Sequence, residues 1–298
     1  MHYALGELNM SKIRIITDSA SDISEKHEKK YNIKVVPFKI AMGDKSYVSR
    51  VDFNNDKFYS MMEAYDGLPL TSQFTAFEFQ EVYEEMYKDG VTDVICVLIN
   101  AQGSATYNNS IMAADNFYED NPEAVGKIRF ISIDGRSYTG AYGYAAVEAA
   151  KMVQRGADVD QIVDFINNWV ENCMIYFALY SLKYAKKSGR IPAAAAFVGD
   201  ALGLKPIMKI FDHVITTDEK VRGDKMIIPT IVKKTATAIE PQTPYCIVYG
   251  NDSSVCDDLA KAMYQKLGYP AAGFYQIGAA IAVNAGPKVV GVIFKKKR

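Results

Sequence analysis

Hydrophobic and polar residues alternate along the first half of the chain in a way that predicts β-α-β units. Short apolar runs, each the length of one strand, are separated by stretches in which apolar residues recur every three or four positions. The expected strands share branched apolar residues and cover 13–16, 34–42, 94–99 and 127–133. Helices are expected near 22–32, 75–90, 106–117, 139–154 and 160–171. Strands that alternate with helices favour a three-layer α/β/α domain with a mostly parallel sheet.

Two polar patterns mark where helices are expected to begin. Asp22 and Glu25 have the spacing of a capping box, in which two side chains satisfy backbone N–H groups of the first helical turn. Thr75 and Glu78 repeat this spacing, and the apolar stripe behind them ends at Gly90. We therefore expect one helix to open at Asp22 and another at Thr75.

The second half of the chain changes character and predicts a mixed α/β domain. Its expected strands cover 175–182, 207–211, 214–217, 245–249, 274–283 and 289–294, with helices near 226–238 and 253–267. The short link Asp212-His213 between two of these strands predicts a hairpin. Because 298 residues exceed what one core comfortably fills, we expect two domains, 1–165 and 166–298, with a ligand cleft between them.

Composition and charge make several classes of protein unfavourable. The chain has 34 Lys and Arg against 35 Asp and Glu, and it carries no long basic stripe of the kind that binds nucleic acid. No stretch approaches eighteen consecutive apolar residues, and the N-terminus lacks the apolar core of a signal peptide, so we expect a cytoplasmic protein with no membrane span. Residues 1–10 are expected to be a disordered extension, with Met10 a candidate for the natural start. The four cysteines form no CxxC pair and are expected to be buried free thiols.

Side chains suited to acid–base or metal chemistry are scarce. The three histidines are His2 at the terminus, His27 in a charged helix and His213 at the predicted hairpin turn, and each is expected to be structural. Zinc-ligand spacing, the phosphate-binding loop and the nucleophile motif GxSxG are all missing from the sequence. The residues therefore predict no metal, no cofactor and no catalytic group.

Small polar clusters stand instead where predicted strands end, at 17–19, 71–73, 103–106 and 284–287. Ligands of open α/β sheets bind outside the carboxyl ends of the strands, where backbone N–H groups favour anions. Each cluster taken alone is equally typical of a turn or a helix cap. Four together, beside so few ionisable candidates, indicate a hydrogen-bonding site for a carboxylate or a phosphate.

Seven ordered motifs carry a resemblance to a known family. They are ITDSASDIS at 16–24, LTSQ at 70–73, GSATY at 103–107, IDGRSYTGAYG at 133–143, SLKYAKKSGRI at 181–191, KPI at 205–207 and KVRG at 220–223. With these motifs the sequence resembles the DegV family, the fatty-acid-binding subunits of the bacterial fatty acid kinase system. The resemblance runs from about Ile13 to Phe294.

The resemblance implies a two-domain α/β protein that buries one long acyl chain in an apolar tunnel between its domains. It further implies that a separate ATP-dependent kinase subunit phosphorylates the bound carboxylate, while the subunit resembled here carries the fatty acid and is not an enzyme. By the same resemblance, the carboxylate is bound by Thr71, Ser72, Ser104 and Asn284. Arg190 and Arg222 match family arginines that would face the partner and stabilise phosphate charge.

Three positions depart from the family pattern. Asn284 stands where the family has a histidine, and an asparagine can donate a hydrogen bond but cannot carry a proton or a positive charge. Ala105 replaces a glycine, and Phe74 replaces a proline at the edge of the site, where its ring would either narrow the tunnel or join the core. Three functions stay open: a carrier for a kinase, a lipid sensor or scavenger without a kinase, and, least favoured, a phosphotransferase in its own right.

Overall fold

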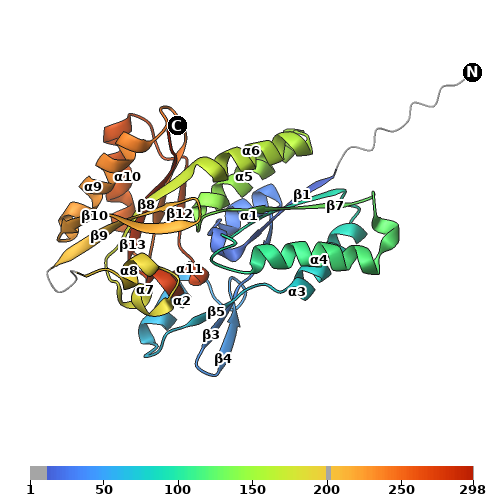
Figure 1. Cartoon of the computed structure of the whole chain (residues 1–298), viewed down its shortest axis with the longest axis horizontal. Helices are drawn as coiled ribbons and strands as arrows, with labels where there is room; N and C mark the ends of the chain where they lie inside the picture. The colour runs from blue at the N-terminus through green and yellow to red at the C-terminus, as the bar shows by residue number, and fades with distance from the viewer. Residues whose placement is uncertain (1–11, 199–202, 298) are drawn as a thin grey trace, which may run out of the picture.

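A computed structural model describes residues 12–198 and 203–297 of the chain. The extension predicted for residues 1–10 lies outside the described residues. Two large sheets dominate the molecule, one built from the first half of the chain and one from the second (Figure 1). This confirms the predicted two-part α/β fold.

The first sheet is parallel throughout, in the order β2-β1-β6-β7. Its strands are β1 (Ile13–Asp18), β2 (Lys34–Val36), β6 (Asp93–Leu98) and β7 (Arg129–Asp134). Cys96 and Leu98 pack with α3 (Ala76–Lys88) and α4 (Thr106–Asp120) on one face. Ile95 and Val97 pack on the opposite face with α5 (Gly140–Gln154) and α6 (Val159–Asn172). Because successive side chains of a strand point to opposite faces, one apolar strand serves both layers, as predicted.

The second sheet has six strands in the order β10-β9-β8-β13-β11-β12, with parallel and antiparallel pairs. The strands are β8 (Cys173–Leu179), β9 (Leu204–Phe211), β10 (Val214–Arg222), β11 (Tyr245–Tyr249), β12 (Gly273–Gln276) and β13 (Val289–Lys295). Helices α9 (Ile227–Ala238) and α10 (Ser253–Leu267) cover one face, and the other joins the main core. The mixed α/β second half and the β9–β10 hairpin are confirmed. The domain boundary predicted after residue 165 falls inside α6 and stays a prediction.

A small third sheet, which the sequence pattern did not predict, lies beside the first. It has the order β4-β3-β5, with β3 (Lys39–Met42), β4 (Lys45–Val48) and β5 (Leu70–Ser72), and α2 (Asn55–Ala64) stands between its last two strands along the chain. The single strand predicted over 34–42 is wrong, because the chain leaves the parallel sheet at Pro37. Proline has no N–H to donate, and the next N–H, that of Phe38, is bound by the Ser19 hydroxyl at 2.9 Å.

Two further predictions fail where a distant partner decides the local structure. Ser24, not Asp22, caps α1 (Glu25–Tyr31), while Asp22 is left-handed, with φ 54°, and accepts a hydrogen bond from the N–H of Gly278. The strand predicted over 274–283 ends at Gln276, and α11 (Ala279–Ala285) follows it. The helix predicted to open at Thr75 is confirmed with its full capping box.

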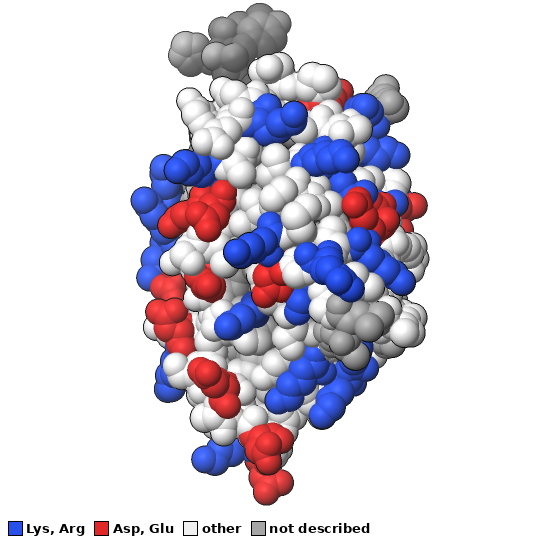
Figure 2. Space-filling model, turned by 90° about the vertical axis from the view of Figure 1, so that its left-hand side faces the viewer, with Lys and Arg blue, Asp and Glu red and all other residues white. Residues whose placement is uncertain are grey.

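The remaining short helices are α7 (Lys183–Ser188), α8 (Pro192–Ala195) and the 3-10 turns at Ser19–Ser21, Pro122–Ala124 and Asp224–Met226. Within residues 12–198 and 203–297, no helix is long and apolar enough to cross a bilayer. All four cysteines are buried free thiols, as predicted. On the side of the molecule drawn in Figure 2, Lys and Arg side chains lie among Asp and Glu, which fits the even charge balance of the sequence.

Candidate functional site

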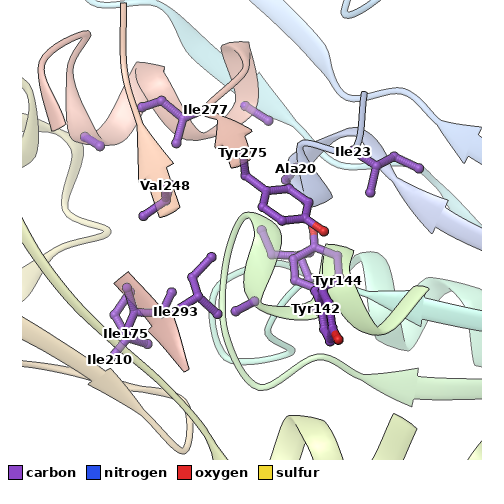
Figure 3. Close-up of a cluster of buried hydrophobic side chains, with 14 of the residues drawn as sticks. Ala20, Ile23, Tyr142, Tyr144, Ile175, Ile210, Val248, Tyr275, Ile277 and Ile293 are labelled. Atoms are coloured by element: carbon purple, nitrogen blue, oxygen red, sulfur yellow. The ribbon is translucent and has the colours of Figure 1, made fainter. Parts of the chain in front are cut away.

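A cavity of about 400 Å³ lies between the carboxyl end of the parallel sheet and the inner face of the six-stranded sheet. Its apolar wall is fully or nearly buried and includes Ile175, Phe177, Ile210, Val248 and Ile277. Figure 3 shows four of these residues within the buried apolar cluster, contributed by β8, β9, β11 and the segment before α11. The cavity therefore has one continuous wall of buried apolar side chains.

Polar side chains line the same cavity and are partly or fully exposed, so they mark its open end. They are Thr71, Gln73, Gln102, Ser104, Asn108, Tyr138, Arg190 and Asn284. Most lie on loops that follow strands of the parallel sheet or on the small sheet beside it. The combination of a closed apolar interior and a polar mouth suits an amphipathic ligand.

Ser104 lies in the loop between β6 and α4. Its hydroxyl is 2.9 Å from that of Thr106 and accepts a hydrogen bond from the Thr106 N–H at 3.3 Å. Helix α4 has Ala105 at its N-cap, which makes no side-chain cap hydrogen bond, and the Ser104 hydroxyl is the acceptor for the first N–H of the helix, that of Thr106. Ala105 and Asn108 line the cavity, so this helix N-terminus lies at its mouth. The partial positive charge of a helix N-terminus favours an anion at this place.

Arg190 brings the positive charge of its side chain to the same loop. It stands between α7 and α8, and its Nη1 donates to the carbonyl oxygen of Gly103 at 3.2 Å. A guanidinium has five N–H donors, so this bond leaves most of them for a ligand. A carboxylate beside Ser104 would thus meet a hydroxyl, backbone N–H groups and one cation.

The structure brings together four of the six site residues that the sequence predicted. Thr71, Ser104, Asn284 and Arg190 all line the cavity, and the Asn284 amide nitrogen donates to the carbonyl of Ala280 at 3.1 Å. Ser72 and Arg222 are exposed and do not line it. Ser72 follows Thr71 on β5, and neighbouring side chains of a strand point to opposite sides. Arg222 is the last residue of β10.

The departures from the family pattern have different outcomes. Phe74 is buried in the core under α3, with its ring 4.9 Å from that of Phe79, so it joins the core and does not narrow the cavity. Ala105 lines the cavity at the start of α4. Gln102, Asn108 and Tyr138 also line it and were not singled out, because long amides and tyrosines in loops carry no pattern that distinguishes them from surface residues.

The polar cluster at 17–19 does not line the cavity, but its buried Asp18 holds the backbone that leads to the Ser104 loop. Asp18 accepts hydrogen bonds from the N–H groups of Ala20 and Ile99 and from the Tyr142 hydroxyl. Burial raises the pKa of Asp18 to about 6, and these three bonds offset part of that rise. Its role is to fix the end of β6, from which the Ser104 loop departs. Among residues 12–198 and 203–297, no cluster of three His, Cys, Asp or Glu side chains is placed to hold a metal.

A family model and several related proteins all point to the same family. A model described as "Uncharacterised protein, DegV family" matches residues 12–297. A DegV domain-containing protein of Clostridium perfringens is 30% identical over 289 residues, which cover 96% of this chain and 99% of the relative. One from Clostridium acetobutylicum is 31% identical over 294 residues, which cover 97% of this chain and 100% of the relative.

Solved structures share the fold at lower identity. A stearic-acid-binding protein of Eubacterium ventriosum superposes with a TM-score of 0.85 at 23% identity, covering 96% of this chain and 98% of that one. A fatty-acid-binding DegV family protein of Thermus thermophilus superposes with a TM-score of 0.81 at 22% identity, covering 96% of this chain and 100% of that one. DegV of Bacillus subtilis, also a fatty-acid-binding protein, gives the same values.

Proposed function

The chain belongs to the DegV family, and from that premise we propose that it binds one long-chain fatty acid in the cavity between its two sheets. The observation that carries the proposal is the shape of the cavity, with a buried apolar wall and a polar mouth at the N-terminus of α4. The fatty-acid binding described for the related structures from Eubacterium ventriosum, Thermus thermophilus and Bacillus subtilis supports it.

Burial of the acyl chain would provide most of the affinity. Each buried methylene contributes about 0.8 kcal/mol, so a chain of about fifteen methylenes contributes on the order of 10 kcal/mol before the costs of association. Ser104 and Thr71 would bind the carboxylate with their hydroxyls, and Arg190 would balance its charge. Asn284 donates one amide N–H to the Ala280 carbonyl, and its second amide N–H would be left to donate to the carboxylate.

The finer function is that of a cytoplasmic carrier, not a catalyst, that presents this carboxylate to a separate ATP-dependent kinase subunit. The exposed mouth supports it, because the polar lining residues there are within reach of a partner. Arg222 is exposed outside the cavity, where a guanidinium can meet a partner or a phosphate. A sensor or scavenger without a kinase is the second candidate, favoured by Asn284, which cannot carry a proton where the family has a histidine.

Native mass spectrometry of the freshly purified protein, followed by extraction and identification of the released molecule, tests the binding function. One fatty acid per chain is the expected result. A protein that is empty, and stays empty after incubation with saturated and unsaturated acids, would overturn the proposal.

Two variants of cavity residues and one control variant outside the cavity test the site. Thr71→Val and Ser104→Ala should each weaken fatty acid binding about tenfold, the value of one hydrogen bond to a charged group. Ser72→Ala, next to Thr71 on the same strand but outside the cavity, should leave affinity unchanged. Transfer of phosphate from ATP to the bound acid by an added fatty acid kinase separates the carrier from the sensor.

A further inference from the structure

The turn of the β9–β10 hairpin, Asp212-His213, reaches from the six-stranded sheet to the loop that carries Ser104. The His213 N–H donates to the Arg136 carbonyl at 2.9 Å, and Arg136 also pairs with the Asp212 carboxylate at 3.0 Å. The imidazole of His213 contacts the Ser104 loop, where its Nδ1 lies 2.8 Å from Oδ1 of Asn100. A residue expected from sequence to be only structural thus touches the loop at the cavity mouth.

Asn100, at the end of β6, is fully buried and organises that loop. Its carbonyl oxygen accepts hydrogen bonds from the N–H groups of Gly103, at 2.9 Å, and Ser104, at 3.1 Å. Its side-chain oxygen accepts from the Gln102 N–H at 3.0 Å, and its amide nitrogen donates to the carbonyl of His213 at 3.0 Å. The backbone position of Ser104 therefore depends directly on Asn100, and Asn100 is bound to His213 on both sides of its amide.

These bonds define the state of the imidazole. The Asn100 amide nitrogen donates to the His213 carbonyl and to the Tyr138 hydroxyl, so the atom that faces Nδ1 is the amide oxygen. Nδ1 must then carry a proton and donate it. Other charged groups facing the ring are the carboxylates of Asp134, 3.6 Å from Nδ1, and Asp212, 3.8 Å from Nε2.

Both residues of this turn have a left-handed backbone, which few residues other than glycine adopt. Asp212 and His213 have φ of 45° and 71°, the left-handed conformation in which two-residue hairpins usually place Asn, Asp or Gly. An imidazole held in this conformation, with its N–H used on another part of the fold, is the kind of outlier that points to a function. Ile210 and Ile215, on the strands either side of the turn, line the apolar part of the cavity.

We propose that His213 is a positioning residue for the ligand carboxylate: through Asn100 it fixes the Ser104 loop relative to the apolar wall that the same hairpin supplies. The inference rests on the fatty-acid-binding function proposed above. Removal of the imidazole takes away one of the two hydrogen bonds to the Asn100 amide oxygen, leaves the one from the Gln102 N–H, and loosens the loop. The backbone bond to Arg136 and the Asp212 pair remain, so the hairpin stays docked.

Three variants test this role, with a fluorescent long-chain fatty acid and the fatty alcohol of the same length as probes. His213→Gly removes the ring and suits the left-handed backbone, so we expect no loss of thermal stability. We expect its dissociation constant for the acid to rise about tenfold, with a much smaller change for the alcohol. His213→Asn places an amide N–H near the position of Nδ1 and should restore binding of the acid. Asp212→Gly relieves the same backbone and should leave the ratio of acid to alcohol affinity unchanged.

A double variant shows whether His213 acts through the Ser104 loop. In a Ser104→Ala background, His213→Gly should have little further effect on the acid, since both changes remove the same interaction. The inference is overturned if His213→Gly keeps the wild-type acid affinity, or if acid and alcohol weaken equally and His213→Asn restores neither. A wild-type protein that binds neither probe would instead overturn the proposed function.

Discussion

Replacement of Asp22 by asparagine is expected to stabilise the protein above pH 7 and to remove part of its pH dependence. One carboxylate oxygen of Asp22 accepts a hydrogen bond from Gly278 at 2.8 Å, while the other is buried and makes no hydrogen bond of good geometry. Burial raises the pKa of this carboxyl from 3.8 to about 7, and the bond from Gly278 and the nearby Thr139 hydroxyl offset only part of the rise. The ionised form is therefore disfavoured in the native protein.

The native and unfolded states hold this proton differently. Between about pH 4 and about pH 7 the unfolded chain has lost it and the native protein keeps it, so the free energy of unfolding falls as pH rises. At about 1.4 kcal/mol per pH unit, the rise in pKa from 3.8 to about 7 costs about 4 kcal/mol at pH 8. Asparagine cannot ionise, keeps an acceptor for Gly278 and tolerates the φ of 54°. Its amide can also donate to the oxygen of the nearby Thr139 hydroxyl.

We expect Asp22→Asn to gain about 2–4 kcal/mol over wild type at pH 8 and to equal it near pH 4. Urea unfolding of both proteins across this pH range measures the difference. Asp18→Asn is the matched control, because both Asp18 oxygens already accept hydrogen bonds. The amide NH2 of asparagine would replace one of these acceptors and face a hydrogen-bond donor. We therefore expect Asp18→Asn to be less stable than wild type at every pH. The reasoning would be refuted if the free energies of unfolding of wild type and Asp22→Asn changed in parallel with pH, or if Asp22→Asn were less stable than wild type at pH 8.

Three further predictions follow from single contacts. Gly143→Ala should lower the free energy of unfolding by about 2 kcal/mol or more, because its methyl would lie 2.2 Å from the Ser21 carbonyl oxygen, and an unchanged urea midpoint would contradict this. Arg190→Gln should weaken binding of a fatty acid about tenfold in calorimetry and leave the matching alcohol unaffected, whereas equal losses would show that the guanidinium does not meet the carboxylate. Burial raises the pKa of Cys96 and Cys256 to about 12, so a thiol reagent at pH 8 should label neither until denaturant is added, and rapid labelling of the native protein would contradict their burial.

Local patterns were sufficient where one stretch of sequence decides its own structure. The apolar run at 94–99 is a buried central strand, the Thr75 capping box opens a helix, and the short link before Val214 is a hairpin. Each depends on contacts within a few residues or on an apolar run that only a sheet interior accommodates. Thr71 and Ser104, which the family resemblance implied, line one cavity, although Thr71 lies within β5 and does not follow a strand as expected.

Long-range partners explain the failures. Asp22 has the spacing of a helix cap, yet it is bound to Gly278, 256 positions away, and Ser24 takes over the cap. The run at 274–283 is apolar on every side, which fits a buried helix as well as a buried strand, and the turn at Gly278 makes it a helix. His213 has no local signal at all, because its partner Asn100 is 113 positions earlier.

The same long-range contacts join the two halves of the chain at the cavity itself. Asp22 and Tyr59, from the first half, bind the backbone of Gly278 and Ile277 just before α11, and α11 carries Asn284 into the cavity. On the other side, the hairpin of the second half is bound to the loop of the first half through Asn100. Both halves thus supply the cavity lining: the polar mouth combines Thr71 and Ser104 of the first half with Arg190 and Asn284 of the second, and these contacts between the halves flank the cavity. A bound acyl chain would touch both, so its binding energy would oppose separation of the halves as well as unfolding of either one.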